Sequence, residues 1–305
     1  MWDALLLQSG YNAALVSIGA ALLGIAAGAV GAFVNLRRRA LVSDAMAHAT
    51  LPGVGLAFLV MVAFGGEGRN LAGLLTGAAL SAALGLWAVQ RLSRTRLPED
   101  TAIGAVLSTF YGAGVVILTV VQELNAGRPA GLEGFLLGST AGMLRADAML
   151  IAGGGATVLL ALWLLRRPLT MVAFDAPHAR MMGVSPTWTD AALMLLTLGV
   201  VLLGLRVVGL ILIVALLITP ATAARMWTNR AGMVAVIAGG IGAVCGYIGA
   251  ATSSAVPDLP TGPVIVVLAF AAFVLSALFA PNRGMIARAL SRLRLRRKLG
   301  AAHGI

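Results

Sequence analysis

Along this chain, apolar runs of about 20 residues alternate with short polar or basic segments. Each run is about long enough to cross the hydrocarbon core of a bilayer as an α-helix. We read nine such runs, at residues 13–35, 44–65, 71–91, 101–121, 146–165, 188–205, 207–225, 232–253 and 262–280. A membrane β-barrel would instead need alternating segments of about 10 residues, which the sequence lacks. The pattern therefore predicts an all-α, polytopic membrane protein with about nine transmembrane helices.

Composition supports this fold class and argues against disulfides and cysteine-based metal sites. Hydrophobic residues make up 60% of the chain and charged residues only 11%, which excludes a soluble domain of this length. The single cysteine, Cys245, lies inside an apolar run. It can form no intrachain disulfide, and it argues against a cysteine-based zinc or iron–sulfur site.

The distribution of basic residues indicates how the chain is oriented in the membrane. A net charge of +11 could point to nucleic acid, but the arginines cluster in short loops between apolar runs and near the C-terminus. With the N-terminus outside, the inner segments hold 18 of the 22 Lys and Arg residues and the outer ones four. This asymmetry predicts an N-out, C-in orientation, a basic cytoplasmic tail at residues 283–305, and no nucleic-acid partner.

Two ionisable residues, Asp44 and His48, enter an otherwise apolar run just after three arginines. In a helix, positions i and i+4 share one face with their Cβ atoms about 6 Å apart. Ionisable groups at membrane depth are costly and are functional candidates. A carboxylate beside an imidazole is a usable half-site for Mn(II), Fe(II) or Zn(II), whereas the alternative is a buried hydrogen bond that tethers the helix. Pro52 and Gly53 predict a helix break one turn later.

A second segment with distinct local signals lies at about residues 174–184. Asp175 is a good N-cap, Pro177 suits a first turn, and Gly183 suits a helix stop. These signals predict a short helix at the inner face, too short to be stable alone. It is either a docking element for another subunit or an ordinary capped interfacial helix.

The run RRRALVSDAMAHATLPGVGLAFL resembles the signature of the permeases of manganese, zinc and iron importers of the ATP-binding-cassette (ABC) class. Segments that begin at Pro98, Phe174 and Val208 resemble that family's fourth span, its coupling helix and its late-span motif. The resemblance covers about residues 15–280. No G-x-x-x-x-G-K-[ST] phosphate loop occurs in the chain, as expected for a permease without its own nucleotide site.

The resemblance implies a type II importer-like permease domain at residues 1–282, in a bacterial cytoplasmic (inner) membrane. This would not be an enzyme, because a separate cytoplasmic subunit would hydrolyse ATP. That subunit would contact the coupling helix through Asp175, Ala179 and Gly183. Asp44 and His48 would bind the transported Mn, Zn or Fe ion, with no permanently bound cofactor. An extracytoplasmic metal-binding protein would deliver the ion, and a second permease copy or paralogue would complete a dimer.

Other functions compete with this interpretation. A permease for a metal chelate, such as a siderophore or corrinoid, would share the coupling helix but would need a wide, neutral path. An ion-coupled secondary transporter could use the Asp–His pair as a relay without an ATPase. An intramembrane enzyme is disfavoured, since H-E-x-x-H and G-x-S-x-G motifs are both missing from the sequence. Asp plus His accommodates all three metals, so the sequence does not select one.

Overall fold

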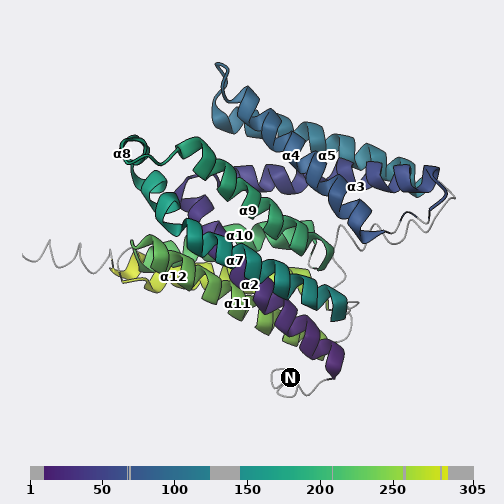
Figure 1. Cartoon of the computed structure of the whole chain (residues 1–305). Coiled ribbons are helices and arrows are strands. Elements are labelled where there is room, and N and C mark those ends of the chain that lie inside the picture. The colour runs from purple at the N-terminus through teal and green to yellow at the C-terminus, as the bar shows by residue number, and fades with distance from the viewer. Residues whose placement is uncertain are drawn as a thin grey trace, which may run out of the picture.

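The computed structural model describes residues 10–66, 68, 70–123, 145–207, 209–256, 259–281 and 284–287. In these residues the regular elements are helices throughout (Figure 1). Their bounds are α2 Tyr11–Leu36, α3 Ala40–Ala63, α4 Leu71–Leu92, α5 Glu99–Glu123, α7 Arg145–Phe174, α8 Ala176–Met181, α9 Pro186–Val207, α10 Leu210–Trp227, α11 Ala231–Ala255 and α12 Thr261–Phe279. The all-α prediction is therefore confirmed for the described part of the chain. Residues 288–305 of the predicted basic tail lie outside it.

Each of the nine predicted apolar runs corresponds to one long helix. Among the described residues, eight helices are long and apolar enough to cross a membrane, and α10 has a shorter apolar stretch, Leu212–Trp227. Helix α7 is longer than the fifth apolar run, because it continues past residue 165 to Phe174. The apolar pattern ends at Arg166, but arginine is a good helix former, so the helix itself continues. The number of membrane crossings and their N-out orientation stay predictions.

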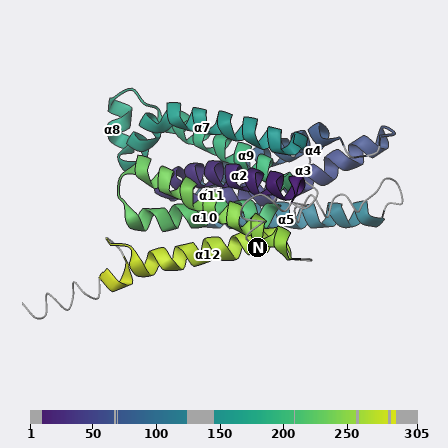
Figure 2. The same ribbon diagram turned by 90° about the horizontal axis from the view of Figure 1, so that it is seen from below.

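The long helices pack in two groups (Figures 1 and 2). The three-helix group consists of α3, α4 and α5, with α3 packed on both of the others. The six-helix group consists of α2, α7, α9, α10, α11 and α12, with α2 at its centre against α11, α10 and α7. Contacts between the groups are much sparser than contacts within them. The short helix α8 lies at one end of the molecule, between α7 and α9 (Figure 1).

Helices α2 and α11 approach each other through small residues. A Cβ atom added at Gly24 would collide with the backbone of Gly242, and one added at Gly28 would collide with the backbone of Ala238. Small residues allow such close backbone approach, which maximises van der Waals contact where no hydrophobic driving force acts between helices in lipid. The small residues at these positions therefore allow α2 and α11 to pack closely at the centre of the six-helix group.

Candidate metal-ion site

Asp44 and His48 lie on one face of α3, as their spacing predicts. His48 Nε2 is 3.5 Å from Asp44 Oδ1, and the two side chains are 23% and 31% exposed. A direct N–H···O hydrogen bond usually measures 2.7–3.2 Å, so this contact is loose for a structural tether. Within the described ranges, no group of three or more His, Cys, Asp or Glu side chains gathers anywhere. The pair thus offers one carboxylate and one imidazole to a small ligand.

The His48 ring is held from α5 by Tyr111. Their ring centroids are 5.2 Å apart and the ring planes meet at 88°, an edge-to-face arrangement. Nδ1 of His48 is buried and has no hydrogen-bond partner among the described residues. Buried polar atoms are normally paired, so an unpaired imidazole nitrogen calls for an explanation such as a bound ion. Nothing in the sequence pattern singled out Tyr111, which lies in an otherwise ordinary apolar run.

The predicted helix break at Pro52 and Gly53 is wrong, because α3 continues through both residues to Ala63. Packing from the other two helices of its group explains the continuity. Gly53 lies against the backbone of Gly77 on α4, and Gly114 on α5 leaves room for the ring of Pro52. Pro52 still has no N–H, so the carbonyl oxygen of His48 loses its usual helical donor.

The segment at residues 174–184 forms the capped helix that its sequence predicts. The Asp175 carboxylate accepts a hydrogen bond of 2.9 Å from the backbone N–H of His178 at the start of α8. At the other end Gly183 has φ +80°, and the N–H of Val184 donates to the carbonyl of Ala179. These are the two ends of a short helix that is stabilised by its caps.

The outer surface of α8 is accessible and mixes polar and apolar side chains, with His178, Arg180 and Met181 all exposed. Ala179 is fully buried against the rest of the chain, whereas Met181 and Met182 are largely exposed. Flexible methionines are well suited to packing into a partner's groove.

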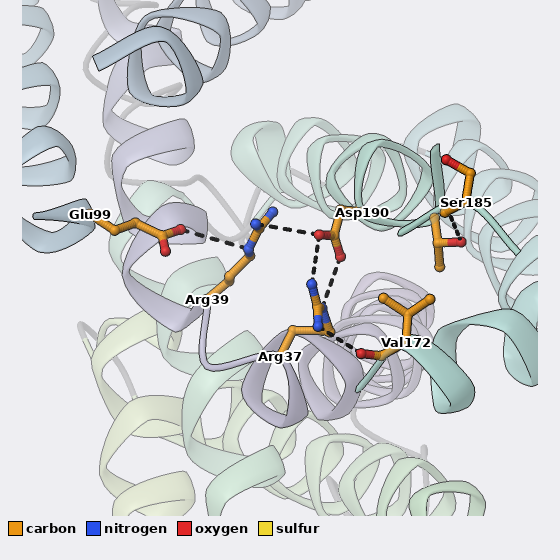
Figure 3. Close-up of polar contacts among 7 residues, drawn as sticks. Arg37, Arg39, Glu99, Val172, Ser185 and Asp190 are labelled. Atoms are coloured by element: carbon orange, nitrogen blue, oxygen red, sulfur yellow. Dashed lines mark hydrogen bonds and ion pairs between the residues drawn. The ribbon is translucent and has the colours of Figure 1, made fainter. Parts of the chain in front are cut away.

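An ion-pair cluster joins the helix ends near α8 (Figure 3). Arg37, at the end of α2, donates from Nε and Nη2 to the two carboxylate oxygens of Asp190 on α9, at 2.9 and 2.7 Å. Its Nη1 donates to the carbonyl of Val172 on α7 at 2.8 Å. Such bidentate, charge-assisted contacts are among the stronger hydrogen bonds. In the sequence, Arg37 indicates only membrane topology and Asp190 carries no signal, because a separation of 153 residues leaves no local pattern.

We expect Asp190→Asn to lower the free energy of unfolding by about 2 kcal/mol, because it leaves the mostly buried Arg37 guanidinium without its counter-charge. The matched control is Asp100→Asn, which removes an exposed carboxylate from the start of α5. Thermal unfolding in one detergent compares the two. Equal melting temperatures for both variants would contradict the structural importance of the Arg37–Asp190 pair.

Comparisons with known proteins agree with one another. Residues 11–280 match the family model described as the ABC 3 transport family. The chain is 42% identical to the manganese transport system membrane protein MntC of Bacillus subtilis, covering 98% of this chain and 68% of the relative. It is 38% identical to the zinc transport system membrane protein TroC of Treponema pallidum, covering 92% and 93%. Among solved structures, PsaBC from Streptococcus pneumoniae in complex with Fab superposes with a TM-score of 0.80 at 29% identity, covering 93% of this chain and 98% of that one.

Proposed function

The chain belongs to the ABC 3 transport family, and we propose on that basis that it is the membrane permease subunit of an ATP-driven importer of divalent metal ions, above all manganese or zinc. The observation that supports this most strongly is the pair of Asp44 and His48 on one face of α3, at 3.5 Å and partly accessible. The relatives that match 98% and 92% of this chain are named as manganese and zinc transport proteins, respectively. Iron, the third metal of the sequence-based prediction, shares the same ligand preferences.

The ion is the cargo of this site, so its ligands must bind and also release it. Asp44 supplies negative charge that offsets the loss of hydration when a divalent ion enters the membrane. His48 supplies a borderline-soft nitrogen, which Mn, Fe and Zn accept and which Mg and Ca disfavour. Two side-chain donors leave most of the coordination shell to water, to other groups of this chain or to groups outside it. A sparse, mixed shell of this kind permits release.

Movement of the ion requires partners that the chain itself does not supply. A separate ATP-binding subunit docks on α8, where Met181 and Met182 are exposed. An extracytoplasmic metal-binding protein loads the ion, and a second permease copy or paralogue forms the other half of the pathway. ATP-driven closure of the ATPase subunits then alternates access to Asp44 and His48 between the two sides. The predicted orientation places α8 on the cytoplasmic side.

Removing the cap of α8 tests the docking role. We expect Asp175→Ala to cost about 1 kcal/mol of local helix stability, because the N–H of His178 loses its acceptor. In a helix as short as Ala176–Met181, that loss should weaken co-purification of the ATPase subunit several-fold. His178→Ala is the control, since only its backbone takes part in the cap. If Asp175→Ala recovers the ATPase as well as His178→Ala does, α8 is not the docking element.

The function is tested by uptake in cells that carry this chain with its ATPase and binding protein. Mn, Zn and Fe are offered separately as free ions. Cells with the active ATPase subunit are compared with cells whose ATPase subunit cannot hydrolyse ATP. The proposal expects accumulation of one or two of these metals only with the active ATPase. Accumulation that persists without the ATPase would identify a secondary transporter. Uptake of a metal chelate but of no free ion would identify a chelate permease.

A further inference from the structure

Arg39 lies at the junction where α2 of the six-helix group leads directly into α3 of the three-helix group. The junction is a tight turn in which Arg38 adopts φ +58°, and α3 begins at Ala40. Asp44 and His48 follow about 8 Å and about 14 Å further along the helix axis, at 1.5 Å per residue. Any displacement of this junction is therefore passed directly to the candidate metal ligands.

The side chain of Arg39 contacts both helix groups at once (Figure 3). Its Nη2 is 3.4 Å from Oδ2 of Asp190 on α9, in the six-helix group. Its Nε is 3.7 Å from Oε1 of Glu99 at the start of α5, in the three-helix group. Arg37, by contrast, makes its side-chain hydrogen bonds to α7 and α9, which belong to the same group as its own helix.

The two arginines also differ in how firmly they are held. Arg37 makes direct hydrogen bonds of 2.7–2.9 Å to mostly buried partners. The contacts of Arg39 exceed the usual length of a direct hydrogen bond, and Glu99 is 50% exposed. An ion pair as exposed as Arg39–Glu99 contributes little to stability and breaks easily. Arg37 thus anchors Asp190 in place, whereas Arg39 forms a contact that can be released.

A cavity of about 450 Å³ lies at this boundary and gives the helix ends room to move. Its lining includes Arg39, Glu99 and Asp190, and also Arg180 from α8. The proposed ATPase-docking helix α8 therefore borders the same cavity as the contact between the two groups. Asp190 lies on α9, so a movement of α8 and α9 would change the distance between Asp190 and Arg39.

We propose that Arg39 is a positioning residue of the transport cycle, acting as the releasable ionic bridge between the two helix groups. While the bridge is closed, Glu99 on α5 and the start of α3 are held against α9. When α8 and α9 move, the bridge opens and the three-helix group, with Asp44 and His48, reorients as a unit. This inference rests on the proposed function for its role in transport, but the bridge itself is a property of this chain.

The first test measures the distance between the groups. Spin labels are placed at Gln90 on α4 and Thr187 on α9, two exposed residues that line the cavity, after the only cysteine is removed by Cys245→Ser. The chain is assembled with its ATPase in lipid nanodiscs without nucleotide. Arg39→Gln is expected to broaden the distance distribution and shift it to longer distances. Arg38→Gln, which changes the neighbouring exposed arginine, is expected to leave the distribution as in the wild type.

Arg39→Lys keeps the charge and should restore most of the short distances, which separates loss of the bridge from misfolding. If the distributions for Arg39→Gln, Arg38→Gln and the wild type coincide, Arg39 does not hold the groups together and the proposal is wrong.

The second test compares transport with ATP hydrolysis. Arg39→Gln is expected to keep its ATPase activity while the metal transported per ATP falls about five-fold, and Arg39→Lys should recover most of it. Equal loss of transport and hydrolysis would assign Arg39 a purely structural role and overturn the proposal. If the wild type transports no metal ion but Arg39→Gln still lengthens the Gln90–Thr187 distance, the proposed function fails while the bridge stands.

Discussion

Asp44→Asn and His48→Ala are each expected to reduce metal uptake at least about 100-fold while the complex with the ATPase stays assembled. Loss of a residue that merely supports a metal ligand typically costs 10–100-fold, so loss of a direct ligand should cost at least the upper value. Asparagine keeps the size of Asp44 and removes its charge, and alanine removes both nitrogens of His48. Uptake of Mn, Zn and Fe is measured separately, together with membrane expression.

Two control variants show whether any loss is specific to the ligands. Tyr111→Phe keeps the ring that contacts His48 at 5.2 Å and should retain most of the uptake. Asp100→Asn removes a carboxylate from the exposed start of α5 and should have no effect. If Asp44→Asn and His48→Ala transport as well as these controls, the pair has a structural role, and the ion follows another path.

Gly242→Ala is expected to destabilise the folded chain by about 3 kcal/mol, at the upper end of the range for overpacking. The added methyl group would collide with the backbone of Gly24 on α2, and a backbone cannot rotate away as a side chain can. The helices would have to separate at the centre of the six-helix group. Gly240→Ala, two residues away on the same helix, places its methyl group in open space.

The same substitution should therefore lower the free energy of unfolding at Gly242 but leave it unchanged or raise it at Gly240. Gly240→Ala is expected to be neutral or to stabilise by about 0.5 kcal/mol, because alanine is the better helix former. Thermal unfolding and the yield of monodisperse protein in one detergent give the comparison. Similar melting temperatures for the two variants would show that α2 and α11 are not in backbone contact.

Features encoded locally were predictable from the sequence. Apolar runs located the nine long helices of the described residues, because a helix that crosses a membrane needs an apolar stretch of matching length. The i, i+4 rule placed Asp44 and His48 on one face. Asp175 and Gly183 marked the ends of α8, since caps are properties of a few neighbouring residues.

Features that depend on tertiary packing were not predictable. The sequence rule for Pro52 predicted a break, but packing of α4 and α5 around α3 keeps the helix continuous. The edge-to-face contact of Tyr111 with His48 joins two helices and has no signature in either. Arg37 and Asp190 are paired across 153 residues, so their shared role emerges only when α2 and α9 meet.

The most direct test of the central claim is to observe the ligands of the bound ion. The complex is prepared with ¹⁵N-labelled histidine, loaded with Mn(II) by its binding protein, freed of unbound protein and metal, and studied by pulsed electron paramagnetic resonance. We expect a hyperfine coupling between Mn(II) and a histidine nitrogen that disappears in His48→Ala. Bound Mn(II) with no histidine coupling in the wild type, or with the same coupling in His48→Ala, would contradict the assignment of Asp44 and His48 as the metal site.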